Sequence, residues 1–401
     1  YTQSSKILKK VRKTAYLFED YLALLEIIKV EMQLVNESQR KTVEEEIEEL
    51  ILEKEKILSL LREESDHLNI YYRLFTKIAH KFELKNKNNQ KKLTAIAPFE
   101  ELADQNPPNS KAAQRRLFQS LAHYYQLIGN FDRSHEYHYK VFEWWSDNPA
   151  YREEQSYRYI IDLSNFLQVS FLVGKHNDVS KLLEQLDKDK PRNFREESVI
   201  FQKVTVNRLL YHLNNSDFDK ALELVPTIES GLSKYKVNDT SRLVLITNTA
   251  ILFFVKEKYD SSKHWIEMIT KTAKSKNRQD LQCIARLLYL VAQYELGEVD
   301  KLDASFRAVH RFFVGNNKLE KDSFELKALA YLKKIFSVSP SDLKDMLNEF
   351  KAYMEEPGNT STTKMKYPGL SELLLWVDSK LTKKSMIALL MVSQHQSNTS
   401  S

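Results

Sequence analysis

Residues 120–137 read SLAHYYQLIGNFDRSHEY, and this stretch decides the fold. Apolar and aromatic side chains recur with helical spacing before Gly129 and again after Phe131. Between them lies a short polar turn that begins with glycine. The stretch therefore predicts two helices joined by a tight turn.

The same arrangement recurs along the chain at a nearly fixed interval. The first residues of five expected turns are separated by 45, 42, 41 and 40 positions, and a sixth hairpin is expected around Val338–Ser341. A period in this range indicates a solenoid, in which neighbouring helix pairs cover one another's apolar faces. The five turns are Gly129-Asn130-Phe131, Gly174-Lys175-His176, Ser216-Asp217-Phe218, Glu257-Lys258-Tyr259 and Gly297-Glu298-Val299.

These units resemble the tetratricopeptide family, whose pattern has a glycine, an aromatic residue, and a small residue three positions after the aromatic. The matching residues are Gly129 with Phe131 and Ser134, Phe218 with Ala221, Tyr259 with Ser262, and Pro191 as the closing proline of the second unit. The resemblance implies that the aromatic residue fills the gap between two helices and that the small residue lets them approach.

The match to the family is degenerate. The units are longer than the family period of about 34 residues. Large residues replace small ones at Leu167, Leu209, Leu290, Val179 and Leu302. HEAT-like repeats, with periods of about 40 to 47 residues, remain an alternative fold.

The expected fold class is all-α, with a right-handed α-solenoid of tetratricopeptide-like hairpins after a long antiparallel helical hairpin. Residues 1–82 should form that hairpin, because helical spacing runs from about Ser5 to Val35 and from about Thr42 to Phe82. Residues 83–111 are expected to be a polar, basic linker. Residues 112–356 should hold about six helix pairs, and residues 357–401 capping helices with a frayed tail.

Composition supports a helical chain and bounds its function. The 401 residues include only 7 glycines and 9 prolines, too few for a chain rich in strands and turns. The net charge of +5 is small, and the basic stretch 85–92 lacks aromatic residues for base stacking, which argues against nucleic-acid binding. No run of 18 apolar residues exists, so no membrane span is expected.

The sequence contains no pattern typical of catalysis, metal binding or cofactor binding. A Walker loop, a dinucleotide fingerprint and a nucleophile elbow are all absent. His135 and His138 do not have the His-Glu-x-x-His spacing of zinc proteases. The lone Cys283 allows no internal disulfide, which fits a cytoplasmic location, although a targeting signal ahead of Tyr1 stays open.

A candidate binding groove follows from three asparagines. Asn165, Asn207 and Asn248 each stand nine residues before a turn. The family resemblance implies that this position lines the concave groove, where asparagine holds the backbone of an extended peptide. A carboxamide has both a donor and an acceptor for such a role. Alternatively, each asparagine bonds a helix backbone or faces water. Neighbouring groove residues would be Arg116, Gln119, His123, Gln126, Gln168, Lys203 and Asn214.

The leading hypothesis is therefore a non-enzymatic scaffold that binds a protein or peptide. The polar, slightly basic groove residues suit an acidic ligand or a C-terminal carboxylate. A second hypothesis is a peptide-responsive regulator, because the long helical front end loosely resembles the Rap-type regulators. A third is a structural subunit of a larger assembly. The sequence does not indicate the oligomeric state.

Overall fold

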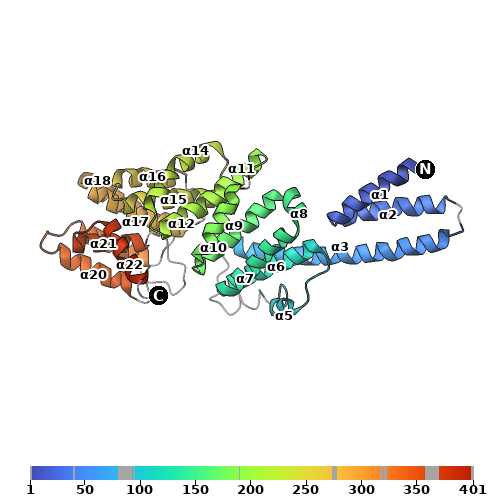
Figure 1. Ribbon diagram of the computed structural model, residues 1–401. Coiled ribbons are helices and arrows are strands. Elements are labelled where there is room, and N and C mark those ends of the chain that lie inside the picture. The colour runs from blue at the N-terminus through green and yellow to red at the C-terminus, as the bar shows by residue number, and fades with distance from the viewer. Residues whose placement is uncertain are drawn as a thin grey trace. The chain divides into compact units, whose positions relative to one another are not determined.

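The computed structural model describes residues 2–38, 41–79, 93, 95–188, 190–272, 278–316, 319, 323–356 and 370–398. Every regular element in these ranges is a helix, which confirms the all-α prediction (Figure 1). None of the described helices combines the length and apolar character needed to cross a bilayer. The basic stretch 85–92 lies outside the described residues. The chain divides into two compact units, Tyr1–Asp178 and Val179–Ser401.

The first unit contains the N-terminal helices and the first predicted repeats. Its helices are α1 (Thr2–Leu17), α2 (Tyr21–Asn36), α3 (Val43–Ala79), α5 (Phe99–Asp104), α6 (Lys111–Leu127), α7 (Phe131–Asp147), α8 (Pro149–Glu154) and α9 (Ser156–Leu172). Helix α10 (His176–Lys188) begins in this unit and ends in the second.

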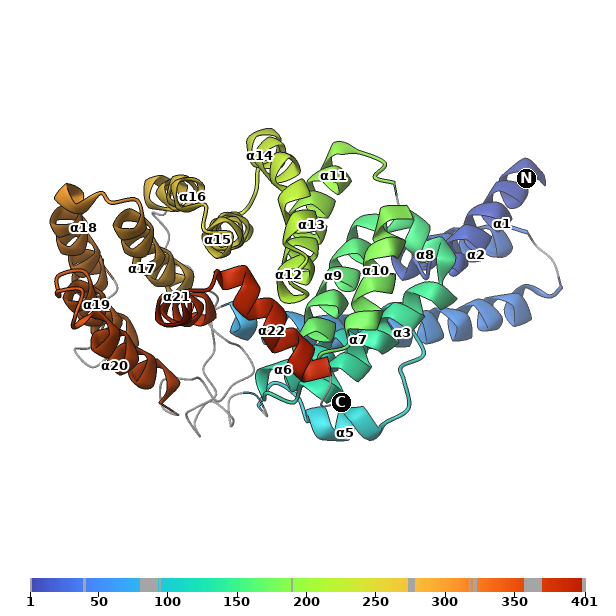
Figure 2. The ribbon, with the colours of Figure 1, turned by 60° about the vertical axis from the view of Figure 1, so that its left-hand side comes forward.

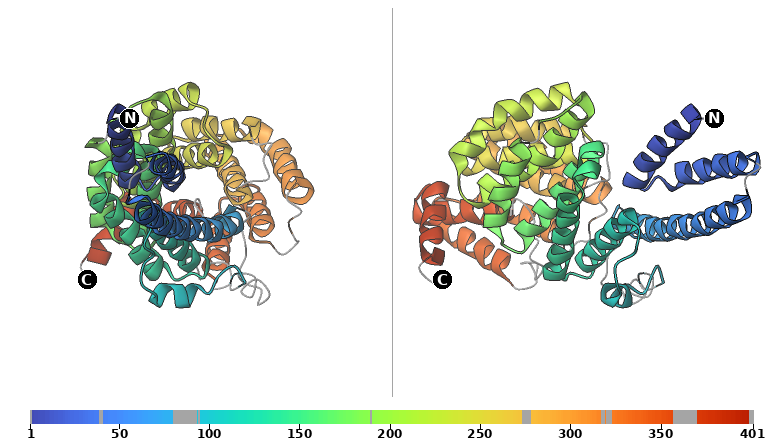
Figure 3. Two further views of the ribbon diagram at one scale, coloured as in Figure 1. Left: turned by 90° about the vertical axis from the view of Figure 1, so that its right-hand side faces the viewer. Right: turned by 45° about the vertical axis from the view of Figure 1, so that its right-hand side comes forward.

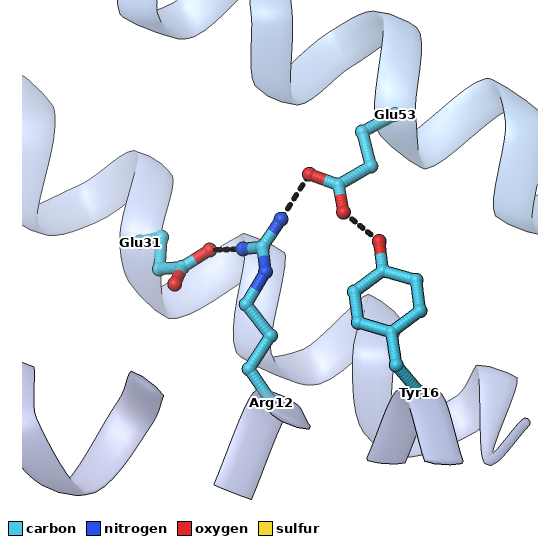
Figure 4. Close-up of polar contacts among 4 residues, drawn as sticks. All are labelled: Arg12, Tyr16, Glu31 and Glu53. Atoms are coloured by element: carbon cyan, nitrogen blue, oxygen red, sulfur yellow. Dashed lines mark hydrogen bonds and ion pairs between the residues drawn. The ribbon is translucent and has the colours of Figure 1, made fainter. Parts of the chain in front are cut away.

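The first long helix that the sequence predicts is in fact two helices. It breaks at Glu19, which has a left-handed backbone with φ of 49°, and the Asp20 side chain accepts a hydrogen bond from the Ala23 amide to start α2. Arg12 and Tyr16 of α1 both bond Glu53 of α3, and Arg12 also bonds Glu31 of α2 (Figure 4). These contacts tie the three N-terminal helices together.

Helix α3 belongs to two hydrophobic clusters. Ile57 in its first half packs in a cluster with Leu24 and Ile28 of α2, whereas Leu74 near its end packs with Leu117 and Leu121 of α6. Figure 3 shows the same helix running beside α2 and continuing to α6. One continuous helix therefore connects the N-terminal helices with α6, the first helix of the first predicted pair.

The expected linker 83–111 contains a packed element. Helix α5 buries Phe99, whose ring stacks on Tyr124 of α6 with 4.5 Å between centroids. Leu93 and Ala97 are buried in the same cluster. The segment is polar overall, so its composition does not indicate these few buried apolar residues. They hold the second half of the segment against α6.

The second unit contains the remaining predicted repeats and the C-terminal helices. Its helices are α11 (Phe194–Ile200), α12 (Val206–Asn214), α13 (Phe218–Glu223), α14 (Val225–Lys234), α15 (Asp239–Val255), α16 (Tyr259–Thr272), α17 (Gln279–Glu295), α18 (Val299–Arg311), α19 (Phe324–Ile335), α20 (Leu343–Glu355), α21 (Leu370–Thr382) and α22 (Met386–Asn398). Two π-helical turns, η1 (Phe201–Thr205) and η2 (Phe312–Asn316), continue α11 and α18. Consecutive helices from α15 to α20 pack against one another (Figure 2).

The five predicted turns share one backbone geometry. Their first residues, Gly129, Gly174, Ser216, Glu257 and Gly297, all have positive φ, between 55° and 79°. The amide of the following residue donates to the carbonyl five positions earlier, as in Asn130 to Tyr125 at 2.9 Å. This is the Schellman ending, which satisfies the last carbonyls of a helix. A new helix then begins at the third residue of each turn.

Two helix pairs carry an additional bond across the hairpin. The Ser134 hydroxyl of α7 donates to the Ala122 carbonyl of α6 at 2.9 Å, and Ser262 of α16 donates to Ala250 of α15 at the same distance. All four residues are buried. Small side chains on both helices let the backbones approach closely enough for this bond.

The C-terminal helices pack onto the second unit. Helix α21 contacts α20 and α15, and the indole of Trp376 donates to Glu295 at the end of α17 at 2.8 Å. The Met386 amide donates to Glu257, in the turn between α15 and α16, at 3.2 Å. Helix α21 therefore packs on α20, which belongs to the last predicted helix pair, and also on α15.

Candidate functional site

Helix α3 covers the side of α6 on which we predicted an open groove. The Arg116 guanidinium lies 4.5 Å from the centre of the Tyr71 ring, and the His123 ring lies 6.0 Å from the same ring. Gln119 and His123 are buried, and Gln126 is half-buried. Arg116 and His123 thus contact the Tyr71 ring of α3, and Gln119 bonds Asp162 in the interior.

Beneath this face lies a polar cluster that sequence reasoning missed. The Asp162 carboxylate accepts hydrogen bonds from Gln119 at 2.6 Å and from the Trp145 indole at 2.9 Å, and it pairs with Arg115 at 3.6 Å. Arg115 is 4% exposed, and its guanidinium lies 4.6 Å from the Trp145 ring centre. Burial lowers the pKa of Arg115 to about 10, an effect that Asp162 opposes. Both oxygens of the carboxylate are used within the fold, so the cluster is structural.

The remaining predicted residues of the first unit lie on α9. Asn165 is half-buried and Gln168 is exposed. Phe166, between them, is buried against the His135 ring, with 5.1 Å between centroids. Asn165 belongs to the first unit, and Asn207 and Asn248 to the second, so only the last two are compared in space.

Asn207 and Asn248 lie on two helices that pack side by side, α12 and α15. Both are about 95% buried, with relative exposures of 6% and 5%. Each side-chain amide donates to the carbonyl one turn earlier in its own helix, to Lys203 at 2.9 Å and to Val244 at 2.8 Å. One N–H of each asparagine side chain therefore bonds a helix backbone, which is the alternative that the sequence left open. Among the described residues no group donates a hydrogen bond to their amide oxygens.

Lys203 stands in the π-helical turn η1, four residues before Asn207. It is half-buried, and burial alone lowers the pKa of its ammonium group. In the described part of the chain no carboxylate lies within 4 Å of its Nζ. A π-helical turn widens a helix by one residue and is frequent at functional sites. The last predicted residue, Asn214, is exposed at the end of α12.

The π-helical turn also borders a cavity of about 520 Å³ between α11, η1 and α14. Phe201 occupies the space opposite Gly231, where a Cβ atom would lie 2.1 Å from the ring. At its rim Lys234 pairs with Glu197 at 2.8 Å, and Tyr235 donates to the same carboxylate at 3.0 Å. The charged groups of this cavity thus neutralise one another.

The histidines that the sequence placed side by side do not form a metal site with any other described ligand. His138 is buried against His123, with 5.7 Å between ring centroids, whereas His135 lies 3.2 Å from Lys175. Within the described ranges no group of three histidine, cysteine, aspartate or glutamate residues is placed to hold a metal ion.

Comparisons of the chain with protein-family models, with curated proteins and with solved structures give no match, so its function has to be argued from its own residues.

Proposed function

We propose that this chain is a non-enzymatic helical-repeat protein that binds a segment of another protein or peptide. The recurring Schellman turns, followed each time by a new helix, support a solenoid of tetratricopeptide-like hairpins. In such a solenoid the first helices of successive pairs line a preformed concave surface. Binding there costs the receptor little ordering entropy.

The observation that carries this proposal is the polar group formed by Lys203, Asn207 and Asn248. Two neighbouring helices hold asparagine at the same position relative to their turns, and a lysine without an acidic partner in the described chain stands one turn away. Amide oxygens accept from peptide N–H groups, and the lysine attracts a carboxylate. The expected ligand is an extended segment with acidic character.

Quantitative affinity capture tests the proposal. The double variant Lys203→Gln with Asn207→Ala should capture at least about tenfold less partner than the wild type. This corresponds to a loss of about 1.4 kcal/mol in binding free energy. Glu229→Gln, exposed on α14 and not a predicted groove residue, is the control and should retain it. Thermal unfolding must show that both variants stay folded. Equal capture by all three proteins would reject the binding role of this group.

A second candidate, the peptide-responsive regulator, is favoured by the position of α3. Because α3 packs on the N-terminal helices with one half and on α6 with the other, a ligand that displaces it from α6 must also move α1 and α2. In this second candidate function, the arrangement in which α3 covers α6 is the state without ligand. Tyr71→Ala, which removes the ring under Arg116, should raise hydrogen exchange in α6 and α3 together. Unchanged exchange in α6 would exclude release of this contact as the switch.

A further inference from the structure

A second cavity in the second unit differs from the first in its charge. It encloses about 490 Å³ between α16, α17, α18 and η2, a volume typical of small-molecule sites. None of the predicted groove residues lines it. Its walls include Ile266 and Val309, which are buried, and Phe312 of the π-helical turn. The cavity is therefore separate from the polar group proposed above and is argued independently of it.

Arg286 of α17 lines this cavity with a positively charged group. Its guanidinium stacks on the Phe312 ring, 3.4 Å from the ring centre, and one nitrogen donates to the Gln282 carbonyl at 2.8 Å. Arginine has five N–H donors, and among the residues that the structure describes the other donors of Arg286 have no acceptor. Burial lowers the pKa of Arg286 to about 10, so the group still carries its charge at neutral pH.

The other polar groups of the cavity define what kind of anion would fit. Arg311 adds a second positive charge at the exposed side, and Glu267 adds a negative one. Tyr289 donates to Glu267 at 3.3 Å, and burial together with that carboxylate raises the pKa of Tyr289 to about 12. The lining thus carries a net charge of about +1 at pH 7. That balance suits a monoanion and disfavours a dianionic phosphate close to Glu267.

We propose that this cavity binds the carboxylate of a small amphipathic ligand, with the carboxylate on the Arg286 guanidinium and an apolar group against Ile266, Val309 and Phe312. The planar guanidinium is stacked on Phe312, and its remaining N–H donors are of the kind that a carboxylate accepts through two parallel bonds. A branched aliphatic side chain would replace water along the apolar wall. The ligand is a free carboxylic acid or the C-terminal residue of a peptide, which share this chemistry.

Isothermal titration of the full chain with N-acetyl-leucine tests the proposal. N-acetyl-leucinamide, which lacks only the charge, should bind at least about tenfold more weakly. Arg286→Gln should weaken binding of the acid by a similar factor. Arg307→Gln, an exposed charge change on α18 outside the cavity, should leave it within about twofold. Equal affinity for acid and amide, or undiminished binding by Arg286→Gln, would overturn the proposal.

Three further measurements complete the experiment. Ala308→Trp fills the cavity without changing charge and should also abolish binding, so the test survives if Arg286→Gln fails to fold. Glycyl-glycyl-leucine separates the two sources, because tighter binding than N-acetyl-leucine assigns the site to a peptide terminus, and equal or weaker binding to a free acid. Displacement of N-acetyl-leucine by inorganic phosphate at equal concentration would reject a monocarboxylate site, as would no binding of any probe.

Discussion

Arg115 in the first unit and Arg286 in the second are both largely removed from water, yet their surroundings are opposite. Arg115 has a carboxylate at 3.6 Å and two tryptophan rings around it, and the same carboxylate bonds two further side chains. Arg286 has an aromatic ring and one backbone carbonyl, and it borders a cavity. A paired buried charge is part of the architecture, whereas an unpaired one beside a cavity points to a missing ligand.

The largest effect that tests this contrast is expected from Asp162→Ala. The change leaves Arg115 buried without a counter-charge and removes the acceptor of Gln119 and Trp145, which should destabilise the first unit by about 3–5 kcal/mol. Urea unfolding monitored by tryptophan fluorescence measures it. Asp147→Ala, exposed on α7, should change stability by less than about 0.5 kcal/mol. If the two variants unfold alike, the cluster around Arg115 is not structural.

A smaller effect is expected where the N-terminal helices meet α6. Glu63 accepts the amides of Asn109 and Ser110 at 3.2 and 2.9 Å, and Glu19 accepts the Lys111 amide at 2.7 Å. These carboxylates satisfy the first amide of α6 and the two amides that precede it, and they complement the helix dipole. Removing either by substitution with alanine should cost about 1–2 kcal/mol.

The sharper readout for this contact is local. Glu63→Ala should accelerate amide exchange at residues 109 and 110 more than within α6, because those two amides lose their acceptor, whereas the Lys111 amide keeps Glu19. Glu26→Ala, exposed on α2, is the control and should leave exchange there unchanged. Uniform acceleration across the first unit would instead indicate general destabilisation, and the specific capping role would be wrong.

Two buried histidines should make the stability of the first unit depend on pH. His123 and His138 are buried beside each other, and burial lowers the pKa of both. Unfolding exposes them at an ordinary pKa of about 6.5, so below that pH the unfolded chain binds more protons than the folded one. Their contribution to stability is complete above pH of about 6.5 and is lost as the pH falls.

Thermal unfolding at pH values of about 7.5 and 5.5 measures this dependence. His138→Gln should reduce the difference in melting temperature between the two, because one neutral buried base is gone. His310→Gln, exposed on α18, should keep the wild-type difference. His135 and His212 also have pKa values lowered by burial, so part of the dependence should persist in His138→Gln. If His138→Gln shows the same difference in melting temperature between the two pH values as the wild type, then His138 does not contribute to the pH dependence of stability.

The turns show what the sequence could predict and why. Ser216 and Glu257 adopt the left-handed backbone usually given to glycine, and in the sequence only the repeat period indicates a turn at these positions. Glu19 has the same geometry, with the Asp20 amide donating to the Ala15 carbonyl at 2.8 Å. It was missed, because no neighbouring repeat marks its position and glutamate is not a turn signal by itself.

The candidate sites were less predictable than the turns. The register of Asn207 and Asn248 could be read from spacing, but the packing of α3 on Arg116 and His123 depends on residues about 50 positions away. Arg286 was not singled out at all. Its signal is that no described carboxylate lies within 4 Å of the guanidinium, and no one-dimensional pattern contains that information.

The smallest effect on stability is expected from Arg286→Met, and it completes the comparison with Arg115. The change removes an unpaired charge and keeps an apolar side chain of similar length against Phe312. Lost cation–π attraction of about 1 kcal/mol is offset by the relief of desolvation, so stability should stay within about 1 kcal/mol of wild type. Arg115→Met, which strands Asp162 in the interior, should cost several times more in the same urea titration. If Arg286→Met is as damaging as Arg115→Met, then Arg286 holds the fold together, and the unpaired guanidinium no longer argues for a ligand.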